Sequence, residues 1–293
     1  MRFASYEQGG NTGIAVAKGD HWHGLTTADA SYPGTLQQLI EAGDAALSQA
    51  AAALAAAPVV DLRQVRLIPP LSSPEKIICI GLNYIDHSAE SGFKQPDYPT
   101  IFARFNSSLI GDGAPILRPA VSDQLDYEGE LVAVIGKTGR HVSEATALDH
   151  VAGYSIFNDA SIRDFQFKAP QWTPGKNFDD TGAFGPWFVT ADELPAGCEG
   201  LKLQTRLNGQ VVQEASISDM VFPVAKLVAL LSSFLTLKPG DLIVTGTPSG
   251  VGLARKPPLW MKAGDVCEVE IEGIGVLSNP IRDSDERKEA LVA

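Results

Sequence analysis

The sequence has 293 residues, which suggests about two domains or one large one, and 44% of its residues are hydrophobic. A chain of this length buries enough apolar surface to fold without disulfides or a structural metal. Its 23 lysines and arginines against 35 aspartates and glutamates give a net charge of −12. That charge argues against a protein that binds nucleic acid by neutralising phosphates, and against docking on anionic lipid.

The first part of the chain is expected to form two short strands and one helix. Residues 13–17 and 21–24 have the alternation and flanking turn residues of strands. Residues 35–57 are rich in leucine and alanine and predict a single helix, which begins at Thr35 as N-cap and stops before Pro58.

A cluster of prolines, Pro69, Pro70 and Pro74, marks a change of pattern. We therefore predict a small N-terminal domain over residues 1–70 and a larger domain over residues 71–293. The larger domain is predicted to be mainly β with some helix, an α+β fold. Its expected strands are residues 76–80, 131–135, 153–156, 201–207, 241–244 and 266–271, and residues 223–235 are expected to form an apolar helix.

The three cysteines, Cys79, Cys198 and Cys267, are far apart and have no metal-finger spacing. Buried thiols in a reducing compartment are the simplest interpretation. The first residues lack the apolar core of a signal peptide, and the Ala-rich stretch at residues 50–60 is too short to span a bilayer. We expect a cytoplasmic protein that does not contact membranes.

Two acidic residues precede the strand at residues 131–135. Glu128 and Glu130 are two positions apart, so on a strand their side chains point to one face. Like charges on a buried strand are costly unless a cation lies between them, and an all-oxygen set favours Mg²⁺, Mn²⁺ or Ca²⁺ over zinc. A solvated acidic entrance to the strand explains the same pattern.

A second polar cluster follows the strand predicted at residues 153–156. Asp159 lies at its end and is a candidate third carboxylate for the same ion. Arg163 and Gln166 are three residues apart, so on a helix they are neighbours. The alternative is a helix N-cap at Asp159 and a surface charge at Arg163.

His87 and Glu90 follow the strand predicted at residues 76–80. On a short helix they would lie on one face, where the carboxylate would orient the imidazole as a water-activating pair requires. A chance pair on a solvent-facing helix is the alternative. Two weaker signals are the Gly-rich stretch at residues 245–252, whose backbone N–H groups suit an anion, and Lys176, a lone cation in a loop.

Together these stretches resemble the fumarylacetoacetate hydrolase family, in particular its bacterial acylpyruvase and diketo-sugar-acid hydrolase branch. The match runs from about residue 70 to residue 281 and keeps the family's motif order. The motifs are Gly81-Leu82-Asn83-Tyr84 followed by His87 and Glu90, Tyr127-Glu128-Gly129-Glu130-Leu131, Asn158-Asp159 with Arg163 and Gln166 behind it, and Gly246-Thr247-Pro248-Ser249-Gly250-Val251-Gly252.

The resemblance implies a catalytic domain with a mixed β-roll, a small N-terminal domain ahead of it, and a homodimer. It also implies a divalent metal, Mg²⁺ with Mn²⁺ or Ca²⁺ as alternatives, held by Glu128, Glu130 and Asp159. His87 and Glu90 match the family's water-activating pair.

The resemblance implies further roles around this metal. Lys176 matches the lysine that stabilises an oxyanion, and Thr247 matches the anchor of the substrate carboxylate. Arg163 and Gln166 match residues near the oxo-acid end of the substrate, and Tyr84 is a further expected substrate contact. Arg104 stands where many relatives have lysine and then proline, so it keeps the charge at the substrate's distal end in a different local sequence.

The reaction implied is hydrolysis of the C3–C4 bond of a 2,4-dioxo acid, which yields pyruvate or a substituted pyruvate and a carboxylic acid. One alternative uses the same residues to isomerise or decarboxylate an acid of the 2-hydroxyhepta-2,4-diene-1,7-dioate or oxaloacetate type. A second is a protein that binds a sugar acid or dicarbonyl without turning it over. We expect a small oxo acid as the ligand, in aromatic or sugar acid catabolism.

Overall fold

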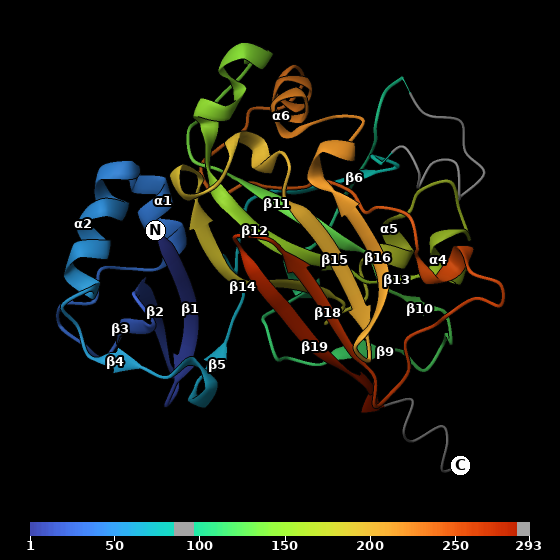
Figure 1. Cartoon of the computed structure of the whole chain (residues 1–293), viewed down its shortest axis with the longest axis horizontal. Coiled ribbons are helices and arrows are strands. Elements are labelled where there is room, and N and C mark those ends of the chain that lie inside the picture. Colours follow the sequence, from blue (N-terminus) through green and yellow to red (C-terminus); the bar gives the residue numbers. More distant parts are fainter. Residues whose placement is uncertain (85–96, 286–293) are drawn as a thin grey trace.

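A computed structural model describes residues 1–84 and 97–285 of the chain (Figure 1). His87 and Glu90 lie outside the described residues. The described part is an α+β structure dominated by sheets, as predicted, and the strand at Val266–Ile271 has the predicted bounds. Within the described ranges, no helix is long and apolar enough to cross a membrane.

Twelve of the described strands form one sheet that runs through the molecule. Their order is β4 (Val59–Val60), β3 (His21–Thr26), β2 (Asn11–Lys18), β1 (Arg2–Gln8), β14 (Gly182–Thr190), β12 (Val151–Asp159), β11 (Gly129–Ile135), β17 (Leu242–Val244), β6 (Ile77–Gly81) and β7 (Thr100–Ala103), with β5 (Arg66–Leu67) paired to β1 and β8 (Leu109–Ile110) paired to β14.

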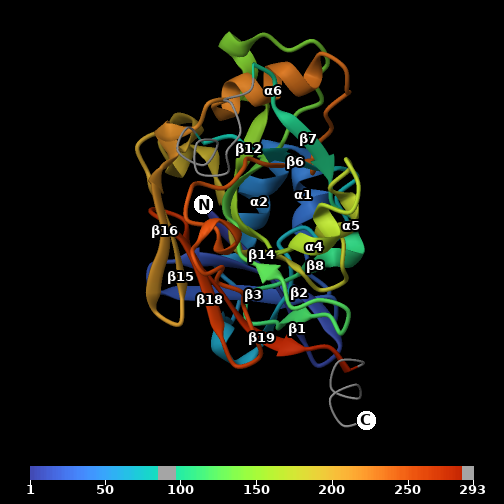
Figure 2. The same ribbon diagram turned by 90° about the vertical axis from the view of Figure 1, so that its right-hand side faces the viewer.

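A second sheet packs over the first (Figure 2). Its order is β16 (Gln210–Ser216), β15 (Lys202–Leu207), β18 (Val266–Ile271), β19 (Gly275–Asp283) and β9 (Ile116–Arg118). The short strands β10 (Leu125–Asp126) and β13 (Ser161–Ile162) pair with each other. The described α-helices are α1 (Leu36–Ala42), α2 (Asp44–Leu54), α4 (Arg163–Gln166), α5 (Thr173–Lys176) and α6 (Val224–Ser232).

The central strand β11 is buried on both faces. Successive side chains of a strand point to opposite sides. Leu131 and Ala133 therefore pack toward the five-stranded sheet and α6, whereas Val132 and Val134 pack toward α1 and α2. Glu130 belongs to the second set by its position in the strand, so its carboxylate must be accommodated inside the molecule.

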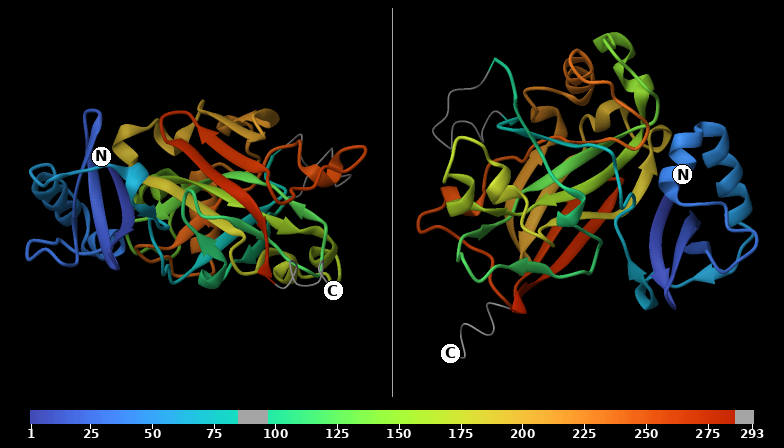
Figure 3. Two further views of the ribbon diagram at one scale, coloured as in Figure 1. Left: turned by 90° about the horizontal axis from the view of Figure 1, so that it is seen from below. Right: turned by 180° about the vertical axis from the view of Figure 1, so that it is seen from behind.

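The N-terminal strands join the large sheet, because β1 pairs antiparallel with β14. Figure 3 shows these strands and α1 and α2 gathered at one end of the molecule. The domain boundary near residue 70 stays a prediction. The strand β1 was not expected from the sequence, since residues 2–8 have no clean alternation of polar and apolar side chains.

The predicted helix at residues 35–57 is in fact two helices. Thr35 caps α1, as predicted, and its side chain accepts a hydrogen bond from the backbone of Gln38. The chain then breaks at Gly43, whose φ of 94° lies outside the helical region and which precedes α2 directly. The three cysteines are free and buried, as expected.

Candidate active site

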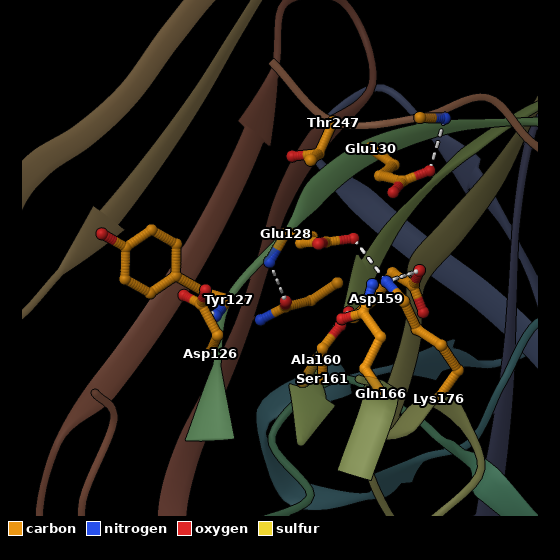
Figure 4. Close-up of polar contacts among 12 residues, drawn as sticks. Asp126, Tyr127, Glu128, Glu130, Asp159, Ala160, Ser161, Gln166, Lys176 and Thr247 are labelled. Carbon is orange, nitrogen blue, oxygen red and sulfur yellow. Dashed lines mark hydrogen bonds and ion pairs between the residues drawn. The ribbon is translucent and has the colours of Figure 1, made fainter. Parts of the chain in front are cut away.

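Three carboxylates meet where β11 begins and β12 ends. Glu128 precedes β11, Glu130 lies within it, and Asp159 is the last residue of β12. The antiparallel pairing sets Asp159 beside Glu128, and its backbone N–H donates to the Glu128 carbonyl oxygen at 2.8 Å. One oxygen from each of the three carboxylates lies within 4.8 Å of the others. The pairing of two strands thus gathers the acidic residues that the sequence analysis suggested as ligands (Figure 4).

Lys176 lies between two of these carboxylates. It is the last residue of α5, and its Nζ donates to Glu128 Oε2 and to Asp159 Oδ2, each at 2.6 Å. The side chain is 1% exposed. Burial lowers the pKa of Lys176, but attraction from Asp159 and Glu128 outweighs burial and leaves that pKa raised. The lysine therefore stays charged in the site.

Two arginines contact the oxygens of Asp159 and Glu128 that Lys176 does not contact. Arg104 donates from Nε to Asp159 Oδ1 at 2.5 Å, and its side chain is fully buried. Arg163 Nη1 lies 2.6 Å from Glu128 Oε1. Arg163 Nε donates to Asp126 Oδ2 at 2.8 Å.

Three buried carboxylates, those of Asp126, Glu128 and Asp159, thus share three cations, and the carboxylate of Glu130 is buried beside them. Glu130 accepts a hydrogen bond from the backbone N–H of Gly246 at 2.5 Å. Burial, and then repulsion from Asp159 and Glu128, raise the pKa of Glu130 well above its usual value. Negative charge on Glu130 is therefore unfavourable in this cluster unless a further cation lies beside it.

This donor set fits a hard divalent cation. All three candidate ligands offer carboxylate oxygens, which Mg²⁺, Mn²⁺ and Ca²⁺ prefer. A carboxylate has about four lone-pair sites on its two oxygens, so the contacts to Lys176 and the arginines leave capacity for an ion. Such an ion would stabilise the charged form of Glu130, which burial and repulsion disfavour.

A cavity of about 340 Å³ opens above the carboxylates. Lys176, Arg163, Gln166 and Thr247 line it. Arg163 and Gln166 lie together in α4, as their spacing predicted, with Nη1 donating to Gln166 Oε1 at 2.8 Å. The buried Nη2 of Arg163 has no hydrogen-bond partner among the described residues. A buried donor without a partner is costly, so a ligand oxygen would stabilise it.

The Gly-rich loop after β17 uses its backbone N–H groups on the protein's own carboxylates. Gly246, at a φ of 98°, donates to Glu130, and Gly252 donates to Asp126 Oδ1 at 2.7 Å. A Cβ at Gly246 would lie 2.8 Å from the Cβ of Asn83, so this close turn requires glycine. Thr247 lines the cavity, and its hydroxyl donates to the carbonyl oxygen of Gly129 at 2.9 Å.

Two expected substrate contacts lie away from the cavity lining. Arg104 is behind the carboxylates, where its Nη2 also donates to the carbonyl oxygen of Ala160 at 2.6 Å. Tyr84 is 1% exposed, and its backbone forms an isolated antiparallel β-bridge with Met220. Neither residue lines the cavity, and their roles in substrate binding stay predictions.

Sequence reasoning missed three residues of this site. Asp126 directly precedes the acidic motif and accepts a hydrogen bond from Arg163. Phe102 and Trp172 line the cavity. Aromatic residues in loops and edge strands usually indicate packing, so this role had no direct sign in the sequence. Their one signal was that they lie within a few positions of Arg104 and Lys176 in the chain.

Comparisons with known proteins agree on one family. The model of the fumarylacetoacetate hydrolase C-terminal domain matches residues 76–282. A mitochondrial protein of Xenopus laevis named an oxaloacetate tautomerase is 42% identical over 272 residues, which is 92% of this chain and 85% of the relative.

Solved structures agree with this match. A fumarylacetoacetate hydrolase from Exiguobacterium antarcticum superposes with a TM-score of 0.84 at 37% identity, covering 97% of this chain and 100% of that one. A maleylpyruvate hydrolase from Sphingobium sp. SYK-6, in complex with manganese(II) and pyruvate, gives a TM-score of 0.79 at 29% identity with the same coverage.

Proposed function

Since this chain belongs to the fumarylacetoacetate hydrolase family of enzymes, we propose that it is a divalent-metal-dependent enzyme that interconverts the enol and keto forms of a 2-oxo acid. Oxaloacetate is the reference substrate, because the Xenopus laevis relative that matches most of the chain is named for its tautomerisation. The reaction moves one proton between the oxygen on C2 and the carbon C3.

The observation that carries this proposal is the polar end of the cavity. A triad of buried carboxylates, a charged lysine between two of them and an arginine with one unpartnered donor all lie at the same end. Such a set suits an acid that presents a carboxylate next to an oxo group. The Sphingobium structure, which holds manganese and pyruvate, supports the same ligand chemistry.

The side chains divide the task. Arg163 and Gln166 bind the substrate carboxylate, because the guanidinium keeps an Nη2 donor for it. Lys176, held charged by Glu128 and Asp159, faces the oxygen on C2 and stabilises the negative charge that develops there. A divalent cation held by the triad would supply a Lewis acid and a template.

Hydrolysis of the C3–C4 bond of an acylpyruvate is the second candidate function. The Sphingobium relative is named a hydrolase and contains pyruvate, which is a product of that cleavage. Hydrolysis begins with the same binding at C1 and C2 but needs an attacking water. His87 and Glu90, outside the described residues, are the pair predicted to activate it.

The test follows the ultraviolet absorbance of the oxaloacetate enol after mixing with purified protein, in Mg²⁺, Mn²⁺ or EDTA. Because metal ions also catalyse this step in solution, the rate is compared with metal alone and with the variant Glu128→Gln. We expect acceleration that needs both metal and Glu128. Acetylpyruvate is assayed in parallel by NMR, and formation of acetate and pyruvate faster than enol loss would favour the hydrolase.

Cellular location and assembly belong to the proposal too. We propose a cytoplasmic homodimer, as the sequence analysis expected. Sedimentation of the purified protein tests the dimer, and fractionation of the source cells tests the location.

A further inference from the structure

The lining of the cavity combines two chemically different sets of residues. Its polar side chains, which we call the polar end, are those of Glu128, Glu130, Arg163, Gln166, Lys176 and Thr247. Its apolar side chains, which we call the apolar wall, are those of Ile80, Leu82, Phe102, Phe167, Trp172, Val251, Leu253 and Ala254. A purely polar substrate would not explain such a wall. A charged group placed against apolar side chains loses its hydration and gains no hydrogen bond in return.

Two of the wall residues, Phe102 and Trp172, form an aromatic pair. Phe102 lies in β7, and Trp172 directly precedes α5. Their ring centroids are 5.5 Å apart in an edge arrangement, which is a favoured aromatic geometry. The Nζ of Lys176 lies 5.0 Å from the centroid of Phe102. The ring of Phe102 therefore lies beside the charged ammonium group of Lys176. Trp172 and Lys176 flank and end the same short helix, α5.

The position of Trp172 depends on a glycine. Gly81 ends β6, and a Cβ built on it would lie 2.3 Å from Cζ3 of Trp172. Any side chain at this position would displace the indole. The fold therefore brings the tryptophan ring directly against the backbone of a core strand, which fixes the wall.

The cationic side chains that line the cavity already form ion pairs with the protein's own carboxylates. Among the described residues that line it, the cationic side chains are Arg163 and Lys176. Both pair with Glu128, and Lys176 also pairs with Asp159. Arg163 retains one donor, enough for one substrate carboxylate. The described lining therefore offers no further cation to a second carboxylate, and burying an unpaired charge against the apolar wall is unfavourable.

We propose that the Phe102–Trp172 pair binds an apolar, planar substituent on C3 of the substrate. The preferred substrates are then 2-oxo acids with one carboxylate and an aromatic or other apolar end, ahead of the dicarboxylate oxaloacetate. The inference rests on the proposed function and specifies its substrate class. The bond changes are those of tautomerisation: the C2 hydroxyl loses its proton, a C–H bond forms at C3, and no other reactant is needed.

Phenylpyruvate is the matched probe, because it replaces the second carboxylate of oxaloacetate with a phenyl ring on the same carbon. We compare kcat/KM for ketonisation of the two enols with Mn²⁺ present. We expect phenylpyruvate to be favoured by about tenfold or more, within the discrimination that an apolar pocket provides. A preference for oxaloacetate would overturn the inference.

Variants separate the wall from the chemistry. Trp172→Ala is expected to lower kcat/KM for phenylpyruvate by about tenfold and to change the value for oxaloacetate much less. Gly81→Ala, which displaces the ring without removing it, is expected to act in the same direction, and Trp172→Phe to retain most activity. Phe105→Ala is the matched control, since Phe105 is 54% exposed and does not line the cavity.

Failure of the inference differs from failure of the function. Equal losses on both substrates in Trp172→Ala would remove the specificity role but keep the tautomerase. If neither enol is turned over, calorimetric titration of wild type and Trp172→Ala with each acid still tests the wall. Phenylpyruvate binding that is no tighter than oxaloacetate binding, or that is unaffected by Trp172→Ala, would then overturn the inference by itself.

Discussion

The two ends of the cavity are held by different forces. At the polar end, the side chains of Asp159, Lys176 and Arg104 are at most 1% exposed and are linked by ion pairs. At the apolar wall, Phe102 and Trp172 are partly exposed and are held by packing. A buried ion network tolerates the loss of no member, because each loss strands a charge. A packed wall tolerates substitution better, so we expect substrate preference to change there without loss of the chemistry.

The largest effect is expected from breaking the polar end. Asp159→Ala leaves both Arg104 and Lys176 without their shared carboxylate. We expect the free energy of unfolding to fall by about 3–5 kcal/mol, the usual result of removing one partner of a buried pair. Urea unfolding followed by circular dichroism measures this. The control Asp179→Ala removes an exposed carboxylate and should change stability by about 0.5 kcal/mol or less.

The stabilisation of the fold by bound metal should depend on Glu130. Wild type is expected to gain about 2.7 kcal/mol of stability when free Mn²⁺ is 100 times its dissociation constant. Glu130→Gln should lose most of that gain. Without metal, however, the variant should be no less stable, because burial and repulsion raise the pKa of the Glu130 carboxyl and its charge is unfavourable there.

Thermal unfolding with and without Mn²⁺ measures both effects of Glu130→Gln. Glu144→Gln, at an exposed glutamate, should keep the full response to metal. A Glu130→Gln protein that Mn²⁺ stabilises as much as wild type would exclude Glu130 as a ligand.

Arg104 should act on the metal through Asp159. Its guanidinium donates to Asp159 Oδ1 and to the carbonyl oxygen of Ala160, a fork that lysine does not reproduce. Arg104→Lys is therefore expected to weaken Mn²⁺ binding by about 10- to 100-fold, as loss of a partner of a metal ligand commonly does.

Calorimetric titration with Mn²⁺ measures the affinity of the Arg104→Lys variant. The control Arg63→Lys changes a side chain that is 89% exposed. Unchanged affinity together with a changed preference between oxo acids would instead favour the role that the sequence analysis gave Arg104, at the distal end of the substrate.

The smallest effect on stability is expected at the wall. Trp172→Ala should cost about 1 kcal/mol, below the 3–5 kcal/mol typical of a fully buried aromatic, because Trp172 is only partly buried. Urea unfolding beside Phe105→Ala measures the difference. A loss as large as that in Asp159→Ala would remove the contrast between the two ends.

Much of this arrangement followed from local pattern. The spacing of Glu128 and Glu130 predicted that their carboxylates lie close together where β11 begins, and the end of an apolar run placed Asp159 at a strand terminus. The spacing of Arg163 and Gln166 predicted their contact in α4. The single helix expected at residues 35–57 was wrong, because composition favoured helix throughout and the backbone turn at Gly43 outweighed it.

The sequence by itself determined the family, the sheet-dominated fold and the acidic residues that form the triad, since short-range spacing and ordered motifs carry that information. Only the tertiary structure decided that Arg104 lies behind Asp159 and that Phe102 and Trp172 face the cavity. These contacts join residues 55 and 70 positions apart. Local pattern does not specify such pairings, because they depend on how β6, β7 and α5 pack around the central strands.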